Sequence, residues 1–212
     1  MNKKKVFFLV GLPGSGKSTL TKYLSDNLSF SVISSNTILE EDNLLNGDYL
    51  KNTYVDHGIS IPDDLYVYLV TKRIKKDSND MFIIEGFPYN LNQLKLSEKM
   101  LKQTNSKLCG VIYLKEKDDV LYKRLINRKV CPKCNQSFNN IVDLCPDCNI
   151  KTIKRDDDEI EIINKRMQTQ KQSLQEVISY YLNTNKLLVF DNMNLKDVDI
   201  EMQKIKTLYK KK

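Results

Sequence analysis

The chain has 212 residues and a mass of 24.7 kDa; 41% of its residues are hydrophobic and 29% are charged. This length suits one well-packed domain with an insertion or two, and no apolar run approaches the eighteen or more residues that a membrane helix needs. Membrane-spanning, collagenous and wholly disordered chains are therefore excluded, while the net charge of +7 is compatible with a nucleic acid, an anionic surface or a phosphorylated small molecule as partner.

The positive charge is concentrated at the two ends of the chain. Lysine runs at residues 3–5 and 210–212 supply six of the seven net charges, which leaves +1 for the body of the protein. We interpret these runs as solvated tails, so the placement of individual cations matters more than their total.

Five short runs rich in β-branched and aromatic residues predict strands that are buried on both faces. Helical spacing of apolar residues follows the first run, at residues 20–28, and precedes the third, at residues 65–74. This alternation indicates an α/β fold in which a five-stranded parallel sheet is flanked by helices. The predicted strands lie at residues 6–10, 31–34, 81–84, 110–114 and 187–190.

Two segments interrupt the alternation and are candidate insertions. Residues 35–62 are polar with a weak helical pattern, and residues 129–154 contain two cysteine pairs. The core domain would then consist of residues 1–34, 63–128 and 155–212.

Residues 11–18 satisfy the pattern G-x-x-x-x-G-K-[ST], directly after a predicted strand and before a predicted helix. In this context the backbone N–H groups of the loop and the helix dipole surround a phosphate. Lys17 is then expected to reach the β- and γ-phosphates of a nucleotide, and Ser18, with Thr19 beside it, to bind Mg²⁺. The predicted nucleotide-binding residues of this loop are Gly11, Pro13, Gly14, Ser15, Gly16, Lys17, Ser18 and Thr19.

Further segments carry patterns that accompany such a loop. They read I-S-S-N-T-I-L-E at residues 33–40, G-I-S-I-P-D-D-L at residues 58–65, E-G-F-P-Y at residues 85–89 and R-D-D-D at residues 155–158. Together with the loop, they resemble the motifs of the adenylate kinase family of nucleoside monophosphate kinases, in its long form with a zinc knuckle in the lid. The resemblance covers nearly the whole chain and implies a P-loop kinase fold with a small helical monophosphate-binding insertion at residues 35–62 and a zinc-knuckle lid at residues 129–154.

On the acceptor side, the resemblance implies that base recognition is retained while the grip on the phosphate is not. Gln93 matches the glutamine that reads adenine, and Ser35 keeps a hydroxyl. Glu40 and Tyr89 stand where the family has arginines that hold the phosphate of AMP. The substrate-binding residues implied by the resemblance are Ser35, Glu40, Ile61, Gly86, Tyr89 and Gln93.

On the donor side, the resemblance supplies a cation at every position that the family uses on the ATP phosphates. These are Lys17, Arg124, Arg128, Arg155 and Arg166, and the acidic pair Asp157 and Asp158 stands between the last two arginines. The resemblance further implies that Asp157 and Asp158 bind the nucleotide and that Arg124 packs on the donor adenine. Arg124 and Arg128 are four residues apart and share a helical face. If residues 155–166 are helical, their two arginines also point the same way. Surface ion pairs with nearby acids are the alternative interpretation of each arginine.

Glu85 replaces the aspartate that binds Mg²⁺ in the family, so Ser18 and Glu85 are the expected Mg²⁺ ligands.

Cys131, Cys134, Cys145 and Cys148 form two C-P-x-C pairs. Four thiolates complete the tetrahedral shell of Zn²⁺ and leave no open position, so we predict a structural zinc site. An iron–sulfur or redox dithiol site and a nucleic-acid-binding ribbon are the alternatives. Because no convincing export signal is present, these thiols also favour a reducing compartment and a cytoplasmic location.

The first functional hypothesis is a kinase that transfers the γ-phosphate of Mg²⁺-bound ATP to a nucleoside monophosphate, AMP by resemblance, giving ADP. The second is a nucleotide-binding protein of kinase descent that transfers little or nothing, and the acceptor could also be a different molecule. The substitutions at Glu40 and Tyr89 keep these alternatives open, because each lost charge-assisted contact costs about 1.5–3 kcal/mol. Expected partners are small nucleotides, with no nucleic acid and no membrane, and the chain is expected to be a monomer.

Overall fold

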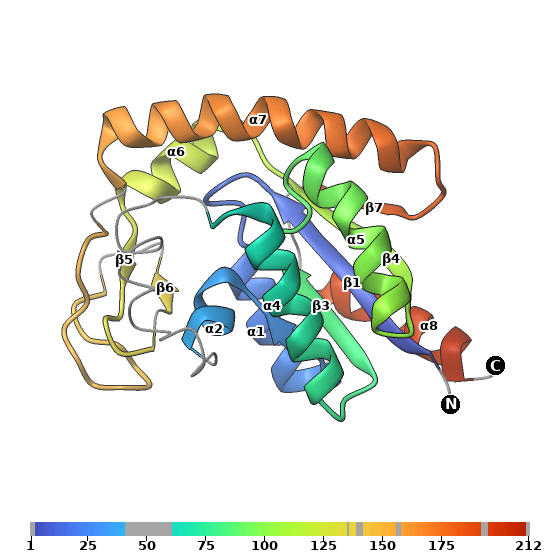
Figure 1. Cartoon of the computed structure of the whole chain (residues 1–212). Coiled ribbons are helices and arrows are strands. Elements are labelled where there is room, and N and C mark those ends of the chain that lie inside the picture. Colours follow the sequence, from blue (N-terminus) through green and yellow to red (C-terminus); the bar gives the residue numbers. More distant parts are fainter. Residues whose placement is uncertain are drawn as a thin grey trace.

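The computed structural model describes residues 3–40, 61–134, 136–138, 142–155, 158–191 and 195–210. Its centre is a parallel sheet of five strands in the order β2-β3-β1-β4-β7 (Figure 1). The predicted α/β fold with a five-stranded parallel sheet is confirmed. The strands are β1 (Lys4–Gly11), β2 (Ser31–Ile33), β3 (Met81–Glu85), β4 (Ser106–Lys115) and β7 (Leu187–Asp191).

The first strand of the sequence lies in the middle of the sheet, because the chain builds β2 and β3 on one side of it and β4 and β7 on the other. In open parallel sheets the crevice for a ligand forms at the carboxyl ends of the strands, where the winding changes side. Here that point is the carboxyl end of β1, between the ends of β3 and β4.

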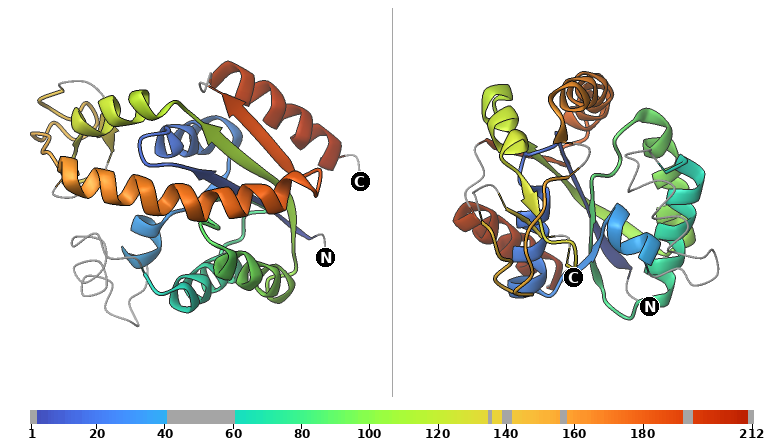
Figure 2. Two further views of the ribbon diagram at one scale, coloured as in Figure 1. Left: turned by 90° about the horizontal axis from the view of Figure 1, so that it is seen from above. Right: turned by 90° about the vertical axis from the view of Figure 1, so that its left-hand side faces the viewer.

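Helices cover both faces of the sheet (Figures 1 and 2). Phe7 and Leu9 of β1 face a cluster completed by α1 and α8, whereas Val6, Phe8 and Val10 face a larger cluster that includes residues of α4, α5 and α7. The alternation follows from the two-residue period of a strand. The helices are α1 (Lys17–Leu28), α2 (Ser35–Glu40), α4 (Asp63–Lys76), α5 (Leu91–Gln103), α6 (Asp118–Ile126), α7 (Ile160–Leu182) and α8 (Leu195–Lys210).

The expectation that every strand is buried on both faces is wrong at both edges of the sheet: Ser31 and Val32 of β2 are only partly buried, and the departure is larger in β7. Val189 is 47% exposed, and no residue of this strand is fully buried. The physical reason is position: β7 lies at the edge of the sheet and pairs only with β4. An edge strand has a neighbour on one side only, so its residues remain more exposed than those of the central strands.

The cysteine-containing segment forms a small unit beside α6 and the start of α7 (Figure 1). Its two short strands, β5 (Lys129–Val130) and β6 (Ser137–Phe138), pair antiparallel and belong to a sheet separate from the main one. Backbone hydrogen bonds between Val130 and Ile153, 2.8 and 2.9 Å long, tie the beginning of this unit to its end. Within the described ranges, no helix has the length and apolar character needed to cross a bilayer.

Candidate functional site

The glycine-rich loop connects the carboxyl end of β1 to the first turn of α1. Gly14 and Gly16 have φ angles of 78° and 94°, a left-handed region that side chains other than hydrogen rarely tolerate. Gly16 is also the residue before α1, so its conformation turns the chain into the helix and leaves the first N–H groups of α1 facing the loop. Such a helix start attracts a phosphate through both its N–H groups and its dipole.

Lys17 lies at the centre of a cluster of charged side chains. Its Nζ donates to the backbone oxygens of Gly11 and Leu12, at 2.8 and 2.9 Å. Burial, helped by the nearby charges of Arg128 and Arg166, lowers the pKa of Lys17 to about 8, although Glu85 acts in the opposite direction. The structure thus brings two of the predicted arginines and the predicted Mg²⁺ carboxylate to the lysine of the loop.

Glu85 ends β3 beside the phosphate-binding loop, because the register of the sheet pairs Glu85 with Leu9 of β1. Its carboxylate accepts hydrogen bonds from Ser18 Oγ at 2.8 Å and from Thr21 Oγ1 at 2.9 Å. Ser18 and Glu85 therefore offer hydroxyl and carboxylate oxygens at one place, which is the donor set that Mg²⁺ prefers. Thr19 is exposed on the same helical turn.

Arg124 of α6 also contacts the phosphate-binding loop. Its Nη1 donates to the backbone oxygen of Gly14 at 3.2 Å, and its Nη2 lies 3.0 Å from Oε2 of Glu116. The Glu116 side chain is only 5% exposed, whereas the Arg124 side chain is 32% exposed. This arginine is therefore anchored through both terminal nitrogens of its guanidinium and is still partly exposed.

Arg128 and Asp158 form a nearly buried pair at the base of the cysteine-containing unit. Arg128 Nε and Nη2 donate to the two carboxylate oxygens of Asp158, at 2.7 and 2.5 Å. Asp158 had been expected to act with the nucleotide, and in the structure its carboxylate holds Arg128. Asp157 lies outside the described residues.

A helix over residues 155–166 would place Arg155 and Arg166 on one face, but the helix in the structure begins later. Helix α7 begins at Ile160, so Arg166 lies within it but Arg155 precedes it by five residues. The Asp158 N–H donates to the Arg155 carbonyl at 3.1 Å, which makes a turn instead of a helix. The condition for a shared face of Arg155 and Arg166, a helix over residues 155–166, is therefore not met.

On the acceptor side, Gln93 is buried and both ends of its amide are engaged. Its Oε1 accepts from the Tyr89 N–H at 3.1 Å, and its Nε2 donates to Asp63 at 2.9 Å. Asp63 also accepts from the amides of Asn90 and Asn92, at 3.2 and 2.7 Å. This carboxylate therefore organises the start of α5 against the start of α4.

The remaining predicted acceptor residues surround these helix starts. Ser35 is exposed at the first position of α2, and Ile61 is buried just before α4. Gly86 follows Glu85 with a φ of 70°, and a Cβ there would meet no atom within 4 Å. Glu40 ends α2, but its side chain lies outside the described part of the chain.

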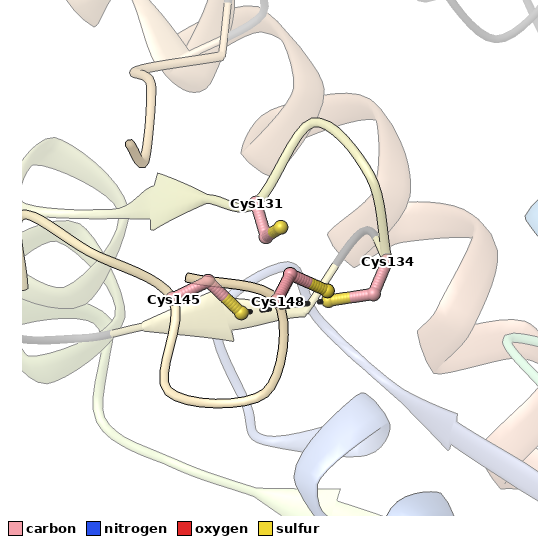
Figure 3. A group of neighbouring side chains, drawn as sticks. All are labelled: Cys131, Cys134, Cys145 and Cys148. Carbon is pink, nitrogen blue, oxygen red and sulfur yellow. Dashed lines mark hydrogen bonds between the residues drawn. The ribbon is translucent and has the colours of Figure 1, made fainter. Parts of the chain in front are cut away.

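The four cysteines of the two pairs converge on one point (Figure 3). Their sulfur atoms all lie within 4.8 Å of one another, and Cys134 Sγ is 3.7 Å from Cys145 Sγ. Sulfurs bound tetrahedrally at a Zn–S distance of about 2.3 Å are about 3.8 Å apart, so this cluster could hold such an ion. Burial raises the pKa of Cys131, but hydrogen bonds from the backbone N–H groups of Cys134 and Lys133 and from neighbouring thiols outweigh it and bring the pKa to about 7, which favours the thiolate form that binds metals. The pKa of Cys134 is raised by burial, and that of Cys148 is raised by its hydrogen bond with Cys134.

Comparison with known proteins places this site in a family. The model described as Adenylate kinase matches residues 9–186. The adenylate kinase of Hydrogenobaculum sp. is 34% identical over 192 residues, which cover 87% of this chain and 91% of that protein. The adenylate kinases of Chlamydia pneumoniae and Methanocella arvoryzae are both 32% identical, over 99% and 97% of this chain and over 100% and 98% of their own lengths.

The chain belongs to the adenylate kinase family. The P-loop kinase fold implied by the sequence motifs is confirmed. Family membership supports a role as a nucleoside monophosphate kinase, which is a phosphotransferase that binds nucleotides. The resemblance drawn from the sequence motifs is confirmed.

Within this adenylate kinase fold, Asp63, Thr21 and Glu116 are residues of the site that were not predicted from the sequence. Thr21 follows Ser18 by three positions and so lies on the same side of α1, a spacing that could have suggested it. Glu116 is one acid within a highly charged stretch, and only its contact with Arg124 distinguishes it from its neighbours.

Proposed function

We propose that this protein transfers the γ-phosphate of ATP to a nucleoside monophosphate, with AMP as the acceptor implied by its family. The observation that carries the proposal is the cluster around Lys17. Arg128 and Arg166 lie near enough to this lysine to lower its pKa, and the Ser18–Glu85 pair lies beside it. Such a concentration of positive charge at a helix start is suited to a polyphosphate.

In the proposed reaction, an oxygen of the acceptor phosphate forms a bond to the γ-phosphorus of ATP while the bond from that phosphorus to the β–γ bridging oxygen breaks. The products are ADP and a nucleoside diphosphate. The acceptor phosphate is already anionic at neutral pH, so no protein group has to remove a proton. The chain contributes positioning and charge neutralisation, for which we assign Lys17, Arg124, Arg128, Arg155 and Arg166.

Two kinds of metal site support this proposal. Ser18 and Glu85 would hold Mg²⁺, which neutralises phosphate charge when it is bound. Cys131, Cys134, Cys145 and Cys148 would hold a structural Zn²⁺, because four sulfurs leave no ligand position for chemistry. Zinc thiolates persist in a reducing compartment, and we accordingly propose a cytoplasmic monomer.

We further propose that residues 35–62 and 129–154 are the acceptor-binding insertion and the lid. The pairing of β5 with β6 in a sheet of its own supports a separate lid, and the Arg128–Asp158 pair lies at its base. Much of the acceptor-binding insertion lies outside the described residues, so its boundaries rest on the sequence.

A nucleotide-binding protein without transfer is the second candidate, and the acceptor side favours it. Glu40 places an anion, and Tyr89 a neutral side chain, at the positions implied to hold the acceptor phosphate. The Gln93 amide is also bound to Asp63 and to the Tyr89 N–H. Each end of the Gln93 amide already has one partner, so AMP would have to use the second Nε2 hydrogen or the second Oε1 lone pair.

The acceptor assignment can be tested by restoring the two cations. We expect the double variant Glu40→Arg with Tyr89→Arg to lower KM for AMP at least tenfold relative to the unaltered chain, because each regained charge-assisted contact contributes about 1.5–3 kcal/mol. A coupled assay of ADP formation measures this change, with GMP, CMP and UMP as alternative acceptors. An unchanged KM for AMP would show that these two positions do not face the acceptor phosphate.

A further inference from the structure

Glu116 is a nearly buried carboxylate at the edge of the sheet where the site lies. It follows the last residue of β4, and its side chain is 5% exposed. Its Oε1 accepts a hydrogen bond from the Lys117 N–H at 3.0 Å, and its Oε2 lies 3.0 Å from Nη2 of Arg124. A buried carboxylate is retained only when it is well paired, and Arg124 is the charged partner that the structure gives it.

Arg124 connects this carboxylate to the phosphate-binding loop. While Nη2 faces Glu116, Nη1 donates to the Gly14 carbonyl at 3.2 Å. The contact lies where α6 presses against the loop: a Cβ on Gly14 would come within 3.2 Å of the Leu121 carbonyl and of Leu125 Cγ. One guanidinium therefore spans from the end of β4 to the middle of the loop.

The two anchors restrict a side chain that would otherwise have many conformations. A free arginine side chain loses conformational entropy when a ligand fixes it in one conformation. An arginine whose planar guanidinium is already held in place loses less entropy when the ligand binds. The Arg124 side chain is still 32% exposed, so part of it remains available to a ligand. Glu116 itself is too buried to reach a nucleotide.

We propose that Glu116 is a positioning residue for the donor nucleotide: it holds Arg124 across the Gly14 carbonyl and thereby prepares both the arginine and the loop to bind ATP. This inference rests on the proposed function, because it concerns the donor half of the same site. It concerns binding, however, and so can be tested without phosphoryl transfer.

The test measures the Kd of Mg²⁺-ATP by calorimetry and, for active protein, KM for ATP and for AMP separately. Glu116→Ala should weaken ATP binding about tenfold, and Glu116→Gln, which keeps an oxygen for the Lys117 N–H but loses the charge, about threefold. Binding of AMP should change less than twofold in both. The matched control is Asp118→Asn, because Asp118 is an exposed acid at the start of α6 that pairs with Lys171; it should leave ATP binding unchanged.

A double-mutant cycle distinguishes positioning from an independent role. If Glu116 acts through Arg124, the variant Glu116→Ala with Arg124→Ala binds ATP no more than twofold more weakly than Arg124→Ala alone. Additive losses, or equal losses of ATP and AMP binding with a lowered thermal midpoint, would overturn the proposal. If the unaltered chain binds ATP without transferring phosphate, the kinase assignment fails while this cycle still decides the role of Glu116; if it binds no ATP, both fail.

Discussion

The environment of Lys17 changes its ordinary chemistry. An exposed lysine is mostly charged up to about pH 10, but burial and the neighbouring arginines bring the pKa of Lys17 to about 8. Near neutral pH it is therefore mostly charged, and it becomes neutral within the next two pH units. A polyphosphate beside it would favour the charged form and raise this pKa.

This difference predicts a proton uptake when ATP binds. Between pH 8 and 9 the free protein loses the Lys17 proton, which the bound state has to regain, so the Kd for ATP should rise by up to about tenfold per pH unit in this range. Calorimetry at pH 8.5 in buffers of different ionisation enthalpy should report uptake of a fraction of a proton. Lys17→Arg, which stays charged throughout, is the control and should remove the pH dependence; a pH-independent Kd in the unaltered chain would contradict the assignment.

At the residue scale, the sequence was most informative where function depends on neighbouring positions. The phosphate-binding loop and the two cysteine pairs are each contiguous patterns, and their chemistry follows from residue type and spacing alone. Thr21 and Glu116 were missed because their partners, Glu85 and Arg124, reach them only through the sheet and the packing of α6. No local pattern separates such an acid or threonine from its many solvated counterparts.

At the scale of elements, the strands were easier to predict than the segments between them. The central strands are buried on both faces, so they appear as continuous apolar runs, whereas β7 is an edge strand with exposed residues. The start of α7 was misjudged because the spacing of Arg155 and Arg166 resembles three helical turns. The chain instead makes a turn at Asp158, where the carboxylate pairs with Arg128.

That pair should be important for stability because it joins the end of α6 to the start of α7. Its side chains are 11% and 0% exposed, so Asp158→Asn leaves a nearly buried guanidinium without its counter-charge. We expect the free energy of unfolding to fall by about 3 kcal/mol, as measured by urea denaturation.

The control for this prediction is the ion pair of Lys129 with Asp143, whose Nζ and Oδ1 atoms are 2.9 Å apart. The Asp143 side chain is 76% exposed. Asp143→Asn should cost less than about 1 kcal/mol, because water already screens this pair. Equal effects of the two substitutions would show that the Arg128–Asp158 pair has no special structural role.

At the scale of the whole molecule, the cysteine-containing unit buries few of its described residues. Val130, Cys131, Cys145 and Thr152 are its buried residues in the described part, which is too few for an independent apolar core. A connection to the core comes from Lys22 of α1, which lies 2.8 Å from Asp147 in an exposed pair. Metal binding is therefore expected to supply much of its folding energy.

Removal of the metal should accordingly be visible in global stability. We expect elemental analysis to find about one zinc per chain, and chelation to lower the thermal midpoint of unfolding. Cys134→Ser should reproduce the loss in the absence of a chelator. Recovery of iron with a visible chromophore would reject the zinc assignment.

The central claim is that the charged cluster around Lys17 transfers phosphate and does not only bind it. The direct measurement is ³¹P NMR of Mg²⁺-ATP mixed with the protein and, in turn, AMP, GMP, CMP and UMP. We predict that the signal of the γ-phosphate moves to a new nucleoside diphosphate with at least one acceptor, that Lys17→Met abolishes the transfer, and that Lys22→Met on the same helix does not. If ATP binds with micromolar affinity but its γ-phosphate reaches none of the four acceptors, the proposed phosphoryl transfer is wrong.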